Sequence, residues 1–374
     1  MEIPLFKVFM SEDAHTMLGP VLQSGYIGQG PKVEEFEEAL RSYLGTPYVN
    51  TLNCGTSGLH LALHMIKEEL SYGDRNEVLT TPLTCTATNW PILANGLKIR
   101  WVDVDPNTAN IDLQDLERKI NERTLAIMVV HWGGYPCDLS RLKLICKKSK
   151  SLYGYEPPVI EDCAHAFGAT YGGKRIGNHG NYCMFSLQAI KHLTTGDGGL
   201  LVCPDDASHR RAKLLRWYGL DRTCSADFRC EQNVAEWGFK FHMNDIAATI
   251  GLANFNHIEA ILYAHHTNGL YYEEHLENVS GVKLLEKRLD RESAYWIYTM
   301  RVENRDDFIR KMKEHGIAVS RVHDRNDKHQ CVHQYRSALP GLDEICADMI
   351  CIPCGWWVGD EEREYIVGKI KEGW

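Results

Sequence analysis

The chain has 374 residues, of which 44% are hydrophobic and 24% are charged, and its net charge is −9 at pH 7. This length fits about two globular domains. Acidic and basic residues are interspersed with no long Lys/Arg cluster, which argues against a nucleic-acid partner, and the apolar runs are too short to span a membrane.

The first residues, MEIPLFKVFM, lack the basic region and apolar run of a signal peptide. The 13 cysteines are scattered through apolar segments, as is typical of free thiols in a reducing compartment. We therefore expect a cytoplasmic protein. Cys351 and Cys354 have the spacing of a zinc-binding pair, but a structural zinc site usually needs a second pair. We predict a strand with two thiols there, and no metal site.

Helix-like and strand-like segments alternate over the first two-thirds of the chain. Residues 31–44 and 57–70 have apolar side chains at helical spacing, with Pro31 in the first turn of one helix and Thr56 or Ser57 as the cap of the other. Short β-branched runs at 77–82, 98–104, 125–130 and 157–162 predict buried parallel strands. The pattern indicates an α/β fold with helices on both faces of the sheet.

The pattern changes after about residue 255. Residues 293–302 and 317–322 are predicted as strands, and residues 305–316 and 360–374 as helices. We expect a large α/β domain over residues 1–255 and a smaller α+β domain over residues 256–374.

A first candidate site lies in the sequence NCGTSGLHLAL, residues 53–63. Gly55, Thr56 and Ser57 open a helix with free backbone N–H groups and hydroxyls, a combination that binds phosphate. The motif lacks the lysine of a P-loop. An ordinary helix cap explains the same residues.

A second candidate lies in PPVIEDCAHAFGA, residues 157–169. Asp162 and His165 follow the apolar part of a predicted strand, and ligands of open α/β sheets bind at the carboxyl ends of strands. A carboxylate there can hold the protonated ring nitrogen of pyridoxal phosphate. The alternative is a capping acid beside a packed histidine.

A third candidate is Lys191, in MFSLQAIKHLTTGDGG, residues 184–199. A lysine with a lowered pKa reacts with an aldehyde cofactor, and Ser186 is close enough in sequence to reach a phosphate at the same site. Alone, Lys191 would be read as a surface charge. The three candidates together supply anchors for the phosphate, the ring nitrogen and the aldehyde of one cofactor.

Six segments in this order resemble the DegT/DnrJ/EryC1/StrS family of sugar aminotransferases. They are GPKVEEFEEAL, NCGTSGLHLAL, VHWGGYPCDL, VIEDCAHAFGA, FSLQAIKHLTTGDGG and GFKFHMNDIAATIGLANF, and the likeness covers essentially the whole chain. The resemblance implies the fold type I of pyridoxal-phosphate-dependent transferases, like that of aspartate aminotransferase. That fold has a mixed, mostly parallel seven-stranded sheet and a smaller C-terminal domain. It further implies a homodimer with its active sites at the subunit interface.

The resemblance also implies residue roles. Lys191 would bind the cofactor covalently and act as acid and base in the 1,3-proton shift, Asp162 would pair with the pyridinium nitrogen, and His165 would lie near the phenolic oxygen. The phosphate would be held by Gly55, Thr56, Ser57 and Ser186.

The chain departs from the family pattern at three places. Cys85 stands where an aromatic residue usually stacks on the cofactor ring, which leaves Cys85, Thr86 and a shifted Trp90 as candidates. In the segment GFKFH, Lys240 stands in place of the family's asparagine and His242 in place of its arginine. We expect Lys240 to contact the cofactor phosphate of the partner subunit across the dimer. The alternative is that Lys240 is a solvated charge. The candidate substrate-binding residues are Gln188, Arg321, His323 and Arg325. The last three lie in the charged segment 321–329, which is equally typical of an exposed polar loop.

The implied activity is transfer of an amino group from L-glutamate, giving 2-oxoglutarate, to a keto sugar. The expected substrate is a nucleotide-linked keto-deoxy sugar, used in amino-sugar biosynthesis for a surface polysaccharide or a glycosylated product; an oxidised octulosonate is the alternative. Two other readings remain. A sugar dehydratase of the family would carry histidine in place of Lys191, and a non-catalytic regulator would tolerate loss of Lys191 or Asp162, but both residues are present.

Overall fold

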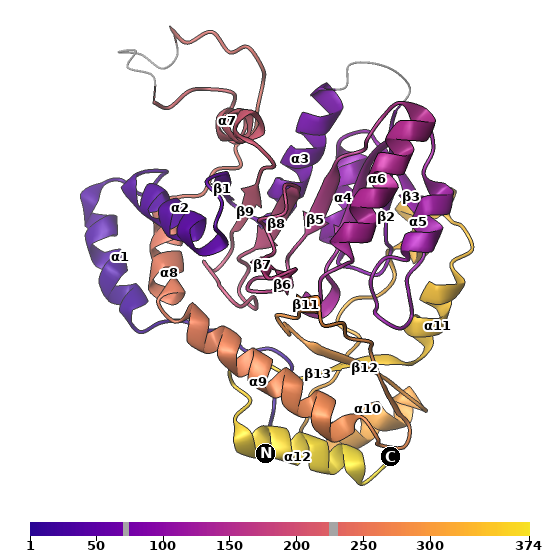
Figure 1. The fold of residues 1–374 in the computed structure, drawn as a ribbon. Helices are drawn as coiled ribbons and strands as arrows, with labels where there is room; N and C mark the ends of the chain where they lie inside the picture. The colour runs from indigo at the N-terminus through magenta and orange to yellow at the C-terminus, as the bar shows by residue number, and fades with distance from the viewer. Residues whose placement is uncertain (70–74, 224–230) are drawn as a thin grey trace.

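The computed structural model describes residues 1–69, 75–223 and 231–374 (Figure 1). Its centre is a seven-stranded sheet in the order β1-β9-β8-β5-β4-β2-β3. The strands are β1 (Val49–Leu52), β2 (Glu77–Thr80), β3 (Lys98–Trp101), β4 (Thr124–Val130), β5 (Val159–Asp162), β8 (Tyr182–Ser186) and β9 (Gly199–Val202). Only β9 runs antiparallel to its neighbours in this sheet. The expected mostly parallel sheet is confirmed.

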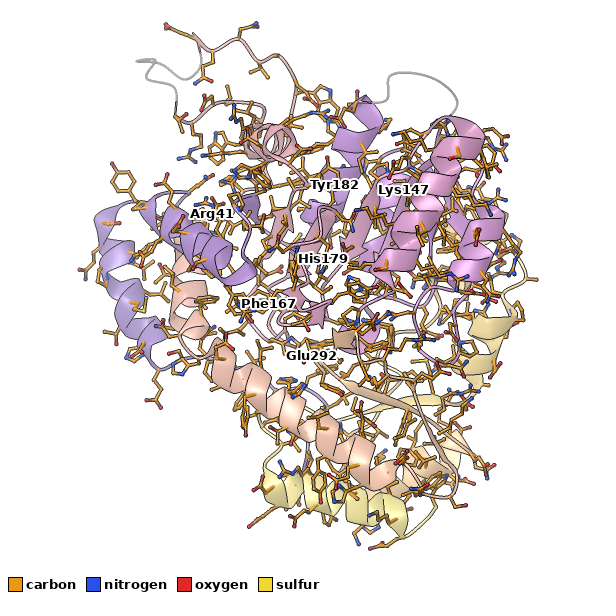
Figure 2. The ribbon with its side chains drawn as sticks, in the orientation of Figure 1. Arg41, Lys147, Phe167, His179, Tyr182 and Glu292 are labelled. Atoms are coloured by element: carbon orange, nitrogen blue, oxygen red, sulfur yellow. The ribbon has the colours of Figure 1, made fainter. Side chains whose placement is uncertain are left out.

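Helices cover both faces of this sheet (Figure 1). They are α2 (Pro31–Leu44), α3 (Gly55–Glu69), α4 (Thr86–Ala94), α5 (Leu113–Lys119), α6 (Leu139–Tyr153), α7 (Asp206–Leu215) and α8 (Asp245–Phe255), with α1 (Asp13–Ser24) packed on α8. The apolar stripe of α2 is buried as its spacing predicts. Phe167, just beyond β5 (Figure 2), stacks on Tyr43 of α2 with ring centroids 5.1 Å apart.

A smaller three-stranded antiparallel sheet, in the order β10-β12-β13, has a core of its own. The strands of this sheet are β10 (Val282–Leu284), β12 (Tyr298–Val302) and β13 (Met349–Ile352). The helices of this part of the chain are α9 (Ile258–Leu276), α10 (Arg305–Glu314), α11 (Pro340–Asp348) and α12 (Asp360–Lys371). Short strands β6 (Thr170–Tyr171), β7 (Lys174–Arg175) and β11 (Arg291–Glu292) form a third sheet. The N-terminal segment joins the smaller part, because Ile3 pairs with Ile317.

Several element boundaries differ from the sequence prediction. Residues 317–322 do not form a strand; they make only isolated bridges, since a tight turn at Val322 breaks the extended backbone. The predicted strand 293–302 is regular only from Tyr298. Helix α3 begins at Gly55, so Thr56 and Ser57 lie in its first turn and do not cap it.

The two thiols of the CIPC segment are both buried. Cys351 lies in β13, as predicted, whereas Cys354 lies two residues beyond the end of that strand. The last residue of the predicted helix 57–70 falls outside the described part of the chain. Within the described residues, no helix has both the length and the apolar character needed to cross a membrane.

Candidate active site

The candidate residues converge where β5 and β8 end beside the first turn of α3. Asp162 is the last residue of β5 and Ser186 the last residue of β8, and the two strands are parallel neighbours in the sheet. The carboxyl ends of parallel strands are the usual ligand-binding edge of an α/β sheet.

The first turn of α3 packs closely against this edge. A Cβ atom added to Gly55 would lie 2.7 Å from Met184 Sδ and 3.3 Å from Ser186 Cβ, so only glycine fits there. Thr56 is exposed, and the Ser57 hydroxyl lies 3.2 Å from the Cys54 thiol. The first-turn N–H groups of this 15-residue helix and the neighbouring Ser186 hydroxyl form a cradle with the composition that a phosphate requires.

Asp162 is a buried carboxyl group with two donors. Its Oδ2 accepts a hydrogen bond of 2.6 Å from the Thr88 hydroxyl, and its Oδ1 accepts one of 3.0 Å from the Ala164 N–H. Burial raises the pKa of Asp162, although both hydrogen bonds and the nearby Lys191 oppose the rise. A buried acid of this kind is suited to a cationic partner such as a protonated ring nitrogen.

Lys191 follows β8 in the loop before β9 and is half-buried. Its Nζ lies 3.5 Å from the centre of a Trp296 ring. Burial lowers the pKa of Lys191 to about 7, against the opposing effects of Asp162 and Cys85. A large share of the amine is therefore neutral near pH 7, and a neutral amine is the form that attacks an aldehyde.

Two histidines face this lysine. His165 stacks on Trp296 with ring centroids 3.8 Å apart, and His323 lies parallel to His165 at 5.5 Å. Burial, with the charge of Lys191 as a further cause, lowers the pKa of His165 well below its usual value and that of His323 to about 4. The Gly133 N–H donates to His165 Nδ1 at 3.3 Å, so the proton of the neutral ring lies on Nε2.

The structure brings some other predicted residues to this site. Cys85 precedes α4 and is close enough to Lys191 to affect its pKa. Gln188 is exposed in the same loop as Lys191. Trp90, the shifted aromatic candidate, instead packs edge-on against His329 at 5.6 Å.

The remaining candidates lie elsewhere or bind internal partners. Arg325 makes a two-pronged ion pair with Asp327, at 2.7 and 2.6 Å, and a further pair with Asp343. Arg321 pairs with Asp324 at 3.6 Å. Lys240 is exposed, and its backbone lies beside Asn53, just before the phosphate cradle.

Sequence reasoning missed Trp296 and Thr88. Trp296 comes from the irregular segment before β12, and its only signal in the sequence is that of an aromatic residue in an apolar run. Thr88 lies in the first turn of α4, and no local pattern links it to Asp162, which is 74 positions away.

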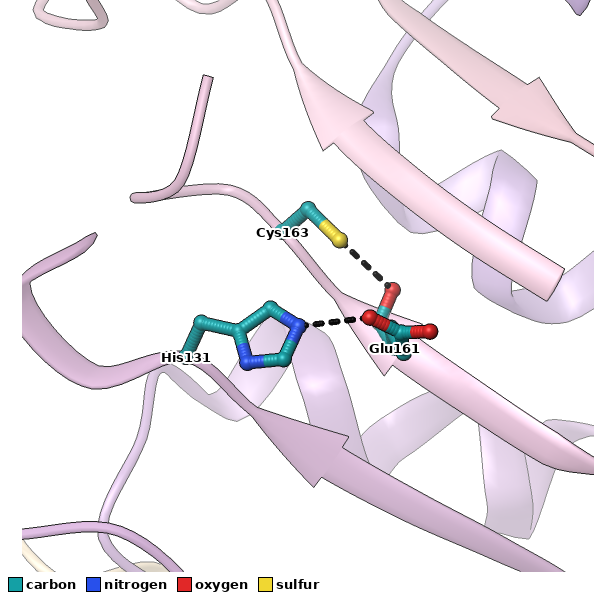
Figure 3. Close-up of side chains that lie close together, drawn as sticks. All are labelled: His131, Glu161 and Cys163. Carbon is teal, nitrogen blue, oxygen red and sulfur yellow. Dashed lines mark hydrogen bonds and ion pairs between the residues drawn. The ribbon is translucent and has the colours of Figure 1, made fainter. Parts of the chain in front are cut away.

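A separate cluster of ligand-type side chains lies behind the site, formed by His131, Glu161 and Cys163 (Figure 3). The Cys137 N–H donates to His131 Nδ1 at 3.0 Å, and His131 Nε2 lies 2.8 Å from Glu161 Oε2. Asn181 donates to the other Glu161 oxygen at 2.6 Å. Because these hydrogen bonds already use both histidine nitrogens and both carboxylate oxygens, we assign the cluster a structural role.

Comparison with known proteins gives a consistent result. Residues 9–371 match the DegT/DnrJ/EryC1/StrS aminotransferase family. The chain is 33% identical to the UDP-4-amino-4-deoxy-L-arabinose–oxoglutarate aminotransferase of Shewanella sediminis over 330 residues, which is 85% of this chain and 82% of that protein.

Solved structures agree over the full length. AtS13 from Actinomadura melliaura is 50% identical, with a TM-score of 0.96 over 100% of this chain and 99% of that one. The sugar aminotransferase CalS13 from Micromonospora echinospora is 48% identical, with a TM-score of 0.95 over 100% of both chains. Spr1654 from Streptococcus pneumoniae, a putative sugar aminotransferase 25% identical to this chain, has been solved in PLP and PMP forms; the PLP form has a TM-score of 0.89 over 100% of this chain and 98% of that one.

Proposed function

Because this chain belongs to the DegT/DnrJ/EryC1/StrS aminotransferase family and is a sugar aminotransferase, we propose that it transfers an amino group from L-glutamate to a nucleotide-linked keto-deoxy sugar. The product would enter amino-sugar biosynthesis for a surface polysaccharide or a glycosylated product. The observation that carries the proposal is the meeting of Lys191, Asp162 and the α3 cradle at one edge of the sheet.

The donor set fits pyridoxal 5′-phosphate. The first turn of α3 and Ser186 would hold the phosphate, Asp162 the ring nitrogen and Lys191 the aldehyde carbon. When bound, the cofactor supplies an aldehyde and an electron-withdrawing ring that let an amino group pass between substrates.

The protein's own side chains have complementary tasks. Lys191 Nζ can take up and return a proton near pH 7, because its pKa is lowered to about 7 by burial. His165 offers its Nε2–H to an oxygen acceptor while the Gly133 N–H fixes its tautomer. Thr88 keeps Asp162 oriented through the 2.6 Å hydrogen bond.

Three observations support the proposed setting of a cytoplasmic homodimer. Large apolar side chains are exposed near the end of α1 and after α7, namely Leu22, Tyr26, Ile27 and Trp237, and Lys240 is exposed beside its own cradle. The eleven cysteines of the described segments are free thiols. Sedimentation of the purified protein tests the dimer. A measured mass of 42.6 kDa, that of a single chain, would contradict it.

Incubation with pyridoxal phosphate, L-glutamate and a panel of keto sugars, read by mass spectrometry, tests the activity. We expect an amino sugar from one nucleotide-linked substrate, and no turnover by Lys191→Ala. Lys148→Ala on α6 is the matched control, since that lysine pairs at the surface with Glu117. Failure of the purified protein to bind the cofactor overturns the proposal; amination of a free octulosonate overturns its substrate, and release of a deoxy-keto sugar without amination overturns the reaction.

A further inference from the structure

Trp296 is a buried residue that connects two parts of the candidate site. Only 2% of its surface is exposed. Its Nε1–H donates to the Ile190 carbonyl at 2.9 Å, and its backbone N–H donates to the Gly133 carbonyl, also at 2.9 Å. The indole is therefore fixed both to the residue before Lys191 and to the turn that orients His165.

The ring carries more than packing contacts. Lys191 Nζ lies 3.5 Å from a ring centre, within the range of a cation–π interaction. His165 stacks on the same indole at 3.8 Å, and Phe6 of the N-terminal segment stacks at 4.8 Å. These contacts leave the indole little freedom to move away from the lysine.

The groups around Lys191 give the ring a specific task. Asp162 and Cys85 favour the ammonium form of Lys191, whereas burial disfavours it. The charge of Lys191 in turn lowers the pKa of the neighbouring His165 and His323. His192, the next residue, is turned away, since its Nε2 donates to the Ala294 carbonyl at 2.9 Å and its ring packs on His265. Among the described residues in contact with the lysine, the indole offers a face that attracts a cation without forming a salt bridge.

We propose that Trp296 is a positioning residue that holds the Lys191 ammonium while this lysine is not covalently bound to the cofactor. The inference rests on the proposed function only in taking Lys191 as the covalent anchor. A long lysine side chain has many rotamers in solvent, and an attractive surface beside the reacting centre keeps the released amine within reach of it. The attraction also keeps the amine from leaving as a fully solvated charge.

Stepwise fluorination of the indole at position 296 tests this, because fluorine weakens the attraction of the ring for a cation and changes its shape little. The readout is the pKa of Lys191 in the cofactor-free full chain, from competitive acetylation with acetic anhydride at a series of pH values and mass spectrometry of the Lys191 peptide. We expect the pKa to fall with each added fluorine, by about 0.5–1 unit in total, a 3- to 10-fold loss of protonated amine.

The same substitutions at Trp374 provide the control, because this residue packs on Phe308 at the end of the chain. They should leave the acetylation profile of Lys191 unchanged. A Lys191 pKa that stays constant across the Trp296 series overturns the inference, as does an equal fall in the Trp374 series. Either outcome leaves the amino-transfer assay with the unsubstituted enzyme unaffected, so failure of this inference is distinguishable from failure of the proposed function.

Discussion

Thr88 stabilises the ionised form of the carboxyl group that would face the cofactor. Burial raises the pKa of Asp162, and the Thr88 hydrogen bond is the first of the effects that oppose the rise. Replacing the hydroxyl by a methyl group in Thr88→Val therefore raises this pKa further and reduces the share of carboxylate. We expect pyridoxal phosphate to bind about tenfold more weakly, which corresponds to about 1.4 kcal/mol. An absorbance titration of cofactor binding measures the change.

Thr88→Ser separates this effect from packing. Serine keeps the hydroxyl and loses only the methyl group, so it should restore most of the affinity lost in Thr88→Val. If serine and valine weaken binding equally, the hydrogen bond to Asp162 is not what matters at this position.

The residues found from sequence are those whose chemistry is rare in their surroundings. A lysine near the end of an apolar run, and acids at the end of a strand, stand out without any structure, and Lys191 and Asp162 do meet at one edge of the sheet. Trp296 and Thr88 are ordinary residues for their segments, and only the fold brings them to those two. Arg325 illustrates the opposite case. Its charge stood out in the sequence, but in the structure its guanidinium group forms ion pairs with Asp327 and Asp343.

At the scale of elements, periodic patterns predicted the long helices and the buried strands well. The stripe Val33, Phe36 and Leu40 is fully buried in α2, and the four predicted parallel strands are all present. The prediction of a strand for 317–322 was wrong. The β-branched residues of this segment favour a strand locally, but the His323 N–H donates to the Arg321 carbonyl at 2.7 Å across a three-residue turn. The tertiary structure, in which His323 stacks parallel to His165, differs here from the local preference.

That turn holds Val322 at a φ of 64°, a left-handed conformation that is strained for a β-branched residue. Glycine adopts it freely, whereas alanine retains the strain. We therefore expect Val322→Gly to be more stable than Val322→Ala by about 1 kcal/mol in denaturant unfolding, the reverse of the ordinary order. The glycine variant should also lose kcat/KM, because His323 is then aimed less firmly.

Val319 provides the comparison within the same segment. Its φ is not in the left-handed region, and it is half-buried in the smaller core. Val319→Gly should be less stable than Val319→Ala. An identical order of glycine and alanine at both positions would show that the turn at Val322 stores no strain.

At the scale of the molecule, the site is assembled from parts distant in sequence. The large sheet supplies Asp162, and the loop between its strands β8 and β9 supplies Lys191. The segment before β12 supplies Trp296, and the N-terminal segment, which pairs with the smaller part through Ile3, supplies Phe6. Buried histidines lie at this junction. His192 and His265 pack on each other with ring centroids 4.5 Å apart, and His265 Nδ1 donates to the Tyr295 carbonyl at 2.8 Å.

These histidines make stability depend on pH in a definite direction. Burial lowers the pKa of His265 and of His323 to about 4, and those of His192 and His165 well below the ordinary value of 6.5. Between pH 6.5 and 4 the unfolded chain binds protons that the folded chain does not, so acid lowers the free energy of unfolding. Above pH 6.5 the contribution vanishes.

Each such histidine adds up to about 1.4 kcal/mol per pH unit to the acid slope of the free energy of unfolding. His265→Asn removes one titrating group while its amide can still donate to the Tyr295 carbonyl. Denaturant unfolding of the cofactor-free protein at pH 4.5 to 6 should therefore give a slope shallower by about that amount. His15→Asn, at an exposed position of α1, should leave the slope as it is. Equal slopes for the His265 variant and the parent protein would mean that the acid sensitivity arises elsewhere in the molecule.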